Sequence, residues 1–209
     1  MVSLPYCPRC GASIGPNIPI RPDGCNMCPP TLPRFASVVR LGPYAGVLRL
    51  LVRRLKYRKR EEICPPLARM ICESLQAGGD GRFDVVVPVP MHWLRRLSRS
   101  YDHTLELARQ IAGPLNLSVG QELTRIRNTP PQVNLPRSSR WENVKGCFAA
   151  RGGDTITGAR VLLVDDVVTT GATADQAAKT LLEAGASRVE LAVIAKSEPP
   201  TAYSQRQET

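Results

Sequence analysis

The pattern of apolar and polar positions changes at about residue 34 of the chain. Beyond that point, short apolar runs alternate with segments whose apolar side chains recur at helical spacing. Residues 83–90 and 161–164 are apolar runs too short for a helix and indicate buried strands, and residues 37–44 are also strand-like. This alternation predicts an α/β protein with a parallel sheet flanked by helices. The helical segments are residues 46–57, 61–76, 102–112 and 174–184.

Several boundaries of these segments can be predicted from single residues. Asp102 is placed to cap the N-terminus of the helix that follows it, and Gly113-Pro114 is expected to end that helix. Pro65-Pro66 is expected to break the helix at 61–76 near its start. Residues 128–143 lack an apolar period and are rich in Pro, Ser and Arg, which predicts an exposed, mobile loop longer than most connections.

Length and charge narrow the class of protein. A chain of 209 residues accommodates one compact domain and a small appendage. We therefore expect an appendage at 1–33, a main domain at 34–197 and a flexible tail at 198–209. The net charge of +10, from 28 basic and 18 acidic residues, favours an anionic partner such as phosphate, diphosphate or nucleic acid. No stretch is apolar enough for a membrane helix and the N-terminus lacks a signal-peptide pattern, so we expect a cytoplasmic protein.

Cysteine spacing explains how the first 33 residues can be ordered without a hydrophobic core. Two CxxC pairs, Cys7 with Cys10 and Cys25 with Cys28, are separated by fourteen residues, just below the usual spacing of a zinc ribbon. Gly11 beside the first pair and Gly24 beside the second allow the backbone to turn around a metal ion. Two disulfides or redox-active dithiols are the alternatives. The expected location disfavours the disulfides, and the lack of an adjoining βαβ pattern disfavours the dithiols.

The helix at 46–57 is strongly basic. Its apolar residues, from Val47 to Leu55, are expected on one side, and most of its basic residues on the other. Such a face is often simply solvated, but here it is the best candidate in the sequence for binding a polyanion. The candidate nucleic-acid residues are Arg49, Arg53, Arg54 and Lys56.

Residues 159–185 carry the most specific chemical signal. A fully apolar strand leads to Asp165 and Asp166, expected at its open carboxyl end, and a turn of small residues then opens a helix. Backbone N–H groups at a helix N-terminus bind phosphate, and neighbouring carboxylates accept hydrogen bonds from ribose hydroxyls. Paired acids also occur in Mg²⁺ sites for phosphoryl transfer, an alternative that leaves the turn unexplained. The turn residues are Thr169, Thr170, Gly171, Ala172 and Thr173.

The segment VLLVDDVVTTGAT at 161–173 resembles the signature of type I phosphoribosyltransferases, which binds 5-phosphoribosyl 1-diphosphate (PRPP). The resemblance implies the type I phosphoribosyltransferase fold with an N-terminal four-cysteine zinc ribbon. It also implies that Asp165 and Asp166 hold the ribose hydroxyls, that residues 169–173 surround the 5-phosphate, and that Mg²⁺ accompanies PRPP.

Further segments resemble the ComF family of competence-associated proteins. They are the four-cysteine N-terminus, YAGVLRLLVRRLKY, VVVPVPMH and RIRNTPPQVNLPRSSRWENVKGCF. The family commonly has Arg-Gly-Phe-Asn-Gln where this chain has RSYDH at 99–103, so Arg99 is retained while the Gly and Gln are not. The resemblance implies a role in DNA uptake for natural transformation, with single-stranded DNA and a competence helicase as partners.

The phosphoribosyltransferase resemblance also implies two loops around the diphosphate of PRPP. One follows the strand at 83–90, with Arg99 nearby, and the other is the long loop, whose cations Arg137 and Arg140 would neutralise the departing diphosphate. Two functions remain open at this point: a PRPP-binding module of the transformation pathway, or an active phosphoribosyltransferase on an unidentified acceptor. The expected diphosphate-loop residues are Pro88, Val89, Pro90, Met91 and Arg99.

Overall fold

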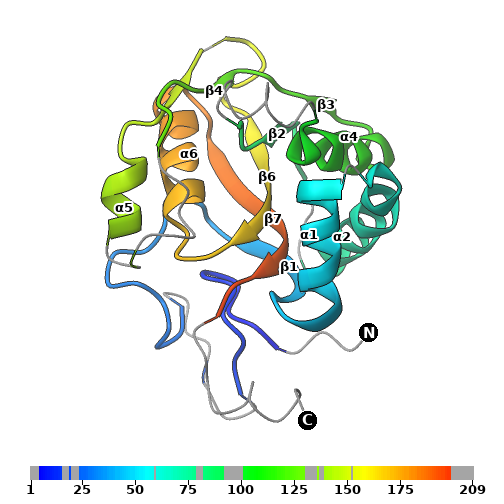
Figure 1. Cartoon of the computed structure of the whole chain (residues 1–209). Helices are drawn as coiled ribbons and strands as arrows, with labels where there is room; N and C mark the ends of the chain where they lie inside the picture. The colour runs from blue at the N-terminus through cyan, green and yellow to red at the C-terminus, as the bar shows by residue number, and fades with distance from the viewer. Residues whose placement is uncertain are drawn as a thin grey trace.

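The structure is a computed structural model that describes residues 5–15, 19, 24–58, 60–78, 82–91, 101–129, 136, 139–151 and 153–198. Its centre is a parallel sheet with the strand order β1-β7-β6-β2-β3 (Figure 1). A small antiparallel pair, β4 with β5, is separate from this sheet. The strands are β1 (Val38–Pro43), β2 (Val85–Pro88), β3 (Ser118–Val119), β4 (Leu123–Arg125), β5 (Phe148–Ala150), β6 (Arg160–Val168) and β7 (Arg188–Lys196).

Helices cover both faces of the sheet, as the alternating pattern predicts (Figure 1). Side chains of a strand point alternately to the two faces, so Val85 and Val87 pack into one core while Val86 packs into the other. The helices α1, α2 and α4 lie on one face, and α5 and α6 on the other. Their bounds are α1 (Gly46–Arg58), the 3-10 helix η1 (Glu61–Ile63), α2 (Cys64–Gly78), α4 (His103–Leu115), α5 (Ser139–Val144) and α6 (Ala172–Glu183).

The predicted boundaries were partly wrong for local reasons. The helix predicted at 61–76 is divided near its start, as expected, but the division lies between η1 and α2: Pro65 and Pro66 lie in the first turn of α2, where a missing N–H removes no helical hydrogen bond. The helix α4 continues through Pro114 and ends at Asn116, whose left-handed φ of 54° forms the C-cap. Part of the predicted long loop forms α5. The Asp102 cap is confirmed, with its side chain accepting a hydrogen bond from the Leu105 N–H at 3.1 Å.

The apolar side of α1 is narrower than the sequence suggested. Leu48, Val52 and Leu55 are buried, whereas Val47 and Leu50 are 59% and 48% exposed. The exposed face of α1 therefore mixes apolar side chains with arginines, and it is not a purely basic surface.

We call residues 5–15 and 24–33 the cysteine module; it lies beside β1 and β7 (Figure 1). Arg40 of β1 is buried and donates to the Ser13 hydroxyl at 2.7 Å and to the Glu198 carboxylate at 3.3 Å. The same Glu198 oxygen accepts the Ser13 N–H at 2.6 Å. Glu198, which we expected in a flexible tail, thus joins the module to the end of β7. Among the described residues, none of the helices has the length and apolarity needed to cross a membrane.

Candidate functional site

The paired acids lie within β6 and not at its end. Asp165 pairs in register with Val193 of β7, and the strand continues to Val168. On its other side β6 has a shorter neighbour, because β2 ends at Pro88 opposite Val164. Asp165 and Asp166 therefore lie beyond the last residue of β6 that pairs with β2, at an open edge of the sheet. Open α/β sheets bind their ligands at such edges.

The two acids differ sharply in their surroundings. Asp165 is half-buried, whereas Asp166 is buried and its Oδ2 is contacted by two side chains from other elements. Lys56 Nζ of α1 lies 2.8 Å from this oxygen, and His103 Nε2 of α4 lies 2.6 Å from it. Asp166 thus reaches the open edge of the sheet, as expected, but it lies there within a largely buried ionic cluster, whereas Asp165 is more open.

These surroundings move the two carboxyl pKa values in opposite directions. Burial, together with the neighbouring Asp166 charge, raises the pKa of Asp165 to about 7. Burial also acts to raise the pKa of Asp166, but the Lys56 charge and the His103 hydrogen bond outweigh it and hold that pKa below its ordinary value. Asp166 is thus a fixed anion, and Asp165 is a carboxyl group that changes charge near neutral pH.

The 169–173 loop leads from β6 into the N-terminus of α6. Gly171 has a φ of +88°, in the region that favours glycine, and serves as the N-cap of α6. The first turn of α6 is fixed by buried Asp175, which accepts the Arg34 backbone N–H at 2.8 Å and its guanidinium at 2.7 Å. The Ala172 N–H of this helix end donates to the Thr170 hydroxyl at 3.4 Å, and the N-terminus of a helix is suited to a phosphate.

A cleft of about 410 Å³ brings the acids and the loop together. Its wall includes the residues that follow β2, and Arg140 of α5 faces the same space. Two expected site residues, Arg99 and Arg137, lie outside the described residues. Among the expected residues, those that line the cleft are Val89, Pro90, Met91, Arg140, Asp165, Asp166, Thr169, Gly171 and Thr173, while Pro88, Thr170 and Ala172 do not line it.

Three basic residues that line the cleft were not predicted as part of a PRPP site. Lys56 was expected on the basic face of α1 with Arg49, Arg53 and Arg54, but its side chain turns toward Asp166. His103 was left without a role, and Arg125 was only part of the ComF-like segment. Arg125 is held by the Thr129 hydroxyl at 2.6 Å and by the Phe148 ring, whose centroid is 5.5 Å away. With Arg140, the side chains of Lys56 and Arg125 give the cleft three cations beside the acidic pair.

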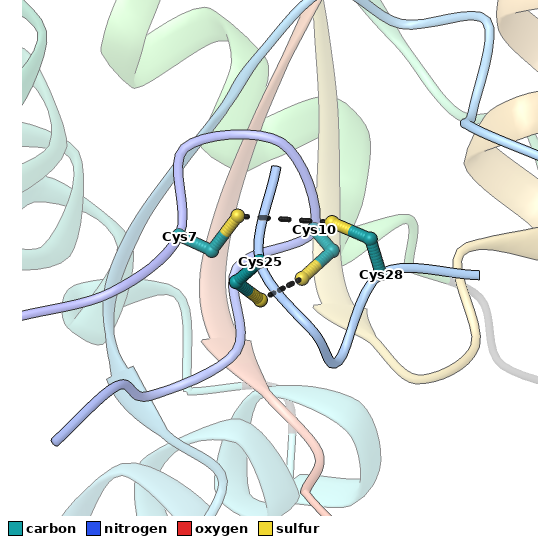
Figure 2. Close-up of side chains that lie close together, drawn as sticks. All are labelled: Cys7, Cys10, Cys25 and Cys28. Carbon is teal, nitrogen blue, oxygen red and sulfur yellow. Dashed lines mark hydrogen bonds between the residues drawn. The ribbon is translucent and has the colours of Figure 1, made fainter. Parts of the chain in front are cut away.

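The four cysteines of the module point their sulfur atoms toward one another (Figure 2). All four Sγ atoms lie within 4.8 Å of each other, and the Cys7–Cys28 and Cys10–Cys25 pairs are 3.8 Å apart. A disulfide would require about 2.05 Å. A tetrahedron of thiolates about 2.3 Å from a zinc ion has edges of about 3.8 Å, so the arrangement can hold such a metal.

The two glycines beside the CxxC pairs, Gly11 and Gly24, adopt the turns that were expected of them. Gly11 has a φ of +75° and Gly24 a φ of +113°. At Gly24 a Cβ atom would lie 2.4 Å from the Cys28 sulfur, so a side chain at this position would displace a ligand of the cluster. The remaining cysteines, Cys64, Cys72 and Cys147, are buried apart from the cluster.

The sequence profile of the phosphoribosyl transferase domain matches residues 68–207 of this chain. The chain belongs to this family, and the predicted parallel-sheet fold is confirmed. The chain is 32% identical over 191 residues to the DNA utilization protein YhgH of Salmonella typhi, covering 88% of this chain and 81% of the relative. It is 26% identical over 201 residues to competence protein F of Haemophilus influenzae, covering 93% and 86%. These relatives confirm the ComF resemblance.

Among solved structures, the chain is similar to a glutamine phosphoribosylpyrophosphate amidotransferase from B. subtilis in complex with ADP and GMP. The similarity covers 72% of this chain and 31% of that chain, with 22% identity and a TM-score of 0.45.

Proposed function

We propose that this chain binds PRPP in the cleft and that it acts in the uptake or processing of DNA for natural transformation. The observation that carries the first part is the meeting of the acidic pair, the N-terminus of α6 and three cations in one cleft. A sugar that bears phosphate at one end and diphosphate at the other requires this combination. Membership of the phosphoribosyl transferase domain family supports the same ligand.

The asymmetry of the acids suggests how the ribose is held. Lys56 and His103 both contact Oδ2 of Asp166, so its Oδ1 remains on the other side of the carboxylate to accept a ribose hydroxyl. Asp165 is half-buried in the cleft wall and accepts the second hydroxyl. The 5-phosphate would then lie on the 169–173 loop, and the diphosphate, with its Mg²⁺, near residues 88–91 and Arg99.

The names of the relatives support the role in DNA handling, since one is a competence protein and the other a DNA utilization protein. We expect single-stranded DNA to bind along the exposed face of α1 at Arg49, Arg53 and Arg54, with a competence helicase as a further partner. Lys56 has no part in this surface because it is paired with Asp166. Such a protein would work in the cytoplasm.

Active transfer of phosphoribosyl to a base or amine is the second candidate function. The observation that favours it is that Arg140 and Arg125 face the same cleft as Lys56, so positive charge surrounds the space where diphosphate would depart. We expect Arg137 to contribute as well. Diphosphate release, assayed with PRPP, Mg²⁺ and a panel of bases and amines, separates an enzyme from a binding module.

We also propose that the metal of the cysteine module is zinc. Its support is the set of four thiols at tetrahedral spacing, because closed sites with four cysteines are typical of structural zinc.

Isothermal titration with PRPP and Mg²⁺ tests the ligand assignment. Asp165→Asn removes the charge but keeps the size of the side chain, and we expect affinity to fall by about 10- to 100-fold, since a hydrogen bond to a charged group contributes about 1.5–3 kcal/mol. Asp154→Asn, at an exposed acid outside the cleft, is the matched control and should bind like the parent. Equal affinity of the parent and Asp165→Asn would show that the ribose is not held here.

A further inference from the structure

The 169–173 loop separates two cavities. On the side opposite the cleft lies a second cavity of about 290 Å³ between the loop and the cysteine module. Cys10 and Ala12 of the module line this cavity, while Thr169 and Gly171 line both cavities. The loop therefore borders both the cleft and the cavity beside the cysteine module, and a residue that supports the loop from the second cavity can influence how the loop receives a phosphate.

The side chain that supports the rear of the loop is Lys196. It is the last residue of β7, is 7% exposed, and lines the second cavity but not the cleft. Its ammonium group donates to the Thr169 carbonyl and, at 3.2 Å, to the Ser197 carbonyl. A buried ammonium group bound to a backbone carbonyl fixes the orientation of that peptide strongly, because the hydrogen bond is charge-assisted and desolvated.

The orientation of this one peptide matters for an anion. A peptide group is planar and trans, so the Thr170 N–H points opposite to the Thr169 carbonyl. With the carbonyl held toward Lys196 and the second cavity, the N–H points away from them. If the peptide turned over, the carbonyl oxygen of Thr169, a residue that lines the cleft, would face the space where a phosphate would lie and would repel it. Lys196 thus selects the peptide orientation that suits an anion.

The cysteine module in turn fixes the position of Lys196. Gly11, the residue after Cys10, packs directly over the lysine stem: a Cβ atom there would lie 3.5 Å from Lys196 Cδ and 3.3 Å from Val38 Cγ1. Two residues beyond Lys196, Glu198 binds Ser13 of the module and Arg40 of β1. The turn that contains Cys10 and Gly11 therefore packs against the Lys196 side chain. Through Ser13, the module also holds Glu198, which follows Lys196 in the chain.

We propose that Lys196 is a positioning residue for the 169–173 loop and that the metal-bound cysteine module holds Lys196 in place. Loss of the metal then weakens binding of a 5-phosphate some distance from the cluster. The inference rests on the proposed PRPP site, and it assigns to the module a part in ligand binding beyond its own folding. The coupling is mechanical: it passes from Cys10 through Gly11 to the lysine stem, and from the ammonium group to Thr169.

The first test compares ribose 5-phosphate with Mg²⁺-diphosphate as separate probes in isothermal titration. Lys196→Met keeps the apolar stem and removes the ammonium group. We expect it to weaken ribose 5-phosphate binding by about 10- to 100-fold and to leave diphosphate binding within about twofold, because the diphosphate would bind at the residues after β2. General loss of structure would weaken both probes. Lys179→Met is the matched control, because this side chain of α6 is 42% exposed and lines neither cavity.

The second test joins the lysine to the metal. Removing the metal from the parent with a chelator should weaken ribose 5-phosphate binding as much as Lys196→Met does. Chelation of Lys196→Met should add little, because both changes act on the same step. Additive losses, or a parent whose affinity is unchanged by chelation, would overturn the coupling.

Hydrogen exchange of the ligand-free protein separates failure of this inference from failure of the proposed function. Amides of residues 169–173 should exchange faster in Lys196→Met and in the chelated parent than in the untreated parent or Lys179→Met. This result is expected even if the parent binds neither probe, in which case the PRPP proposal fails alone. Unchanged exchange in both samples would refute the role of Lys196.

Discussion

Asp165 should lower the stability of the folded protein at neutral pH, and Asp165→Asn should relieve the loss. Burial and the neighbouring Asp166 charge raise the pKa of Asp165 from its ordinary value of 3.8 to about 7. An acid whose pKa is raised on folding binds its proton more tightly in the folded state than in the unfolded state. Stability due to this group therefore decreases as pH rises from about 4 to about 7, and the whole penalty is present above pH 7.

The size of the effect follows from the pKa difference and from the geometry of the cleft. The step from 3.8 to about 7 corresponds to about 4 kcal/mol, since each pH unit contributes about 1.4 kcal/mol. Asp165 is only half-buried, so water in the cleft reduces this upper limit, and we expect a gain of about 1–3 kcal/mol for Asp165→Asn at pH 8. The amide oxygen can still accept the Asp166 N–H, which the carboxylate accepts at 2.8 Å.

Urea unfolding at pH 5, 6, 7 and 8 measures the prediction. The free energies of unfolding of the parent and of Asp165→Asn should be closest at pH 5 and should separate as pH rises. Asp166→Asn provides the opposite sign, because it leaves the partly buried Lys56 ammonium group without its carboxylate; breaking a fully buried pair typically destabilises by about 3–5 kcal/mol, which is the upper limit here. A parent that gains stability over Asp165→Asn between pH 5 and pH 8 would refute the assigned environment of Asp165.

Two further predictions concern the module and the surface of α1. Cys25→Ser should reduce bound zinc from about one ion per chain, measured by elemental analysis, and full zinc content would contradict the four-cysteine site. The variant should also lower the thermal stability of the module, while the sheet keeps its own core. Arg53→Glu with Arg54→Glu should weaken binding of single-stranded DNA and make its affinity less dependent on salt, measured by fluorescence anisotropy at salt concentrations from about 50 to 200 mM. An unchanged slope of affinity against salt concentration would indicate that these arginines make no phosphate contacts.

The parts of the fold and site that could be predicted from the sequence are those determined by residues close together in the chain. The strand at 161–164, the N-cap at Asp102 and the two CxxC pairs each depend on residues a few positions apart, so local periodicity and spacing were sufficient to predict them. The predicted strand end at Asp165 and Asp166 was wrong because it depends on a partner strand that is distant in the sequence. The apolar run stops before the acids, yet β6 continues because β7 still pairs with it.

The residues that sequence reasoning missed depend on contacts between distant elements. Lys56 belongs to a run of basic residues on α1, and nothing in that run shows that this one side chain reaches Asp166 across the face of the sheet. His103 approaches the same carboxylate from α4, and Lys196 reaches the 169–173 loop from the end of β7. The only sequence signal for His103 was its departure from the Gln common in the ComF family.

The difference between the two acids indicates how this cleft combines stability with binding. Asp166 is paired within the protein with the Lys56 ammonium group and hydrogen-bonded to His103, so its charge is present before any ligand arrives and the carboxylate is already oriented. For Asp165 the raised pKa shows that the described cations do not offset its burial. A ribose hydroxyl that donates to Asp165 would supply part of the missing stabilisation, so some of the free energy lost in burying this acid returns on binding. Asp166 thus fixes the geometry of the cleft, whereas Asp165 makes the protein less stable with the cleft empty than with a ligand bound.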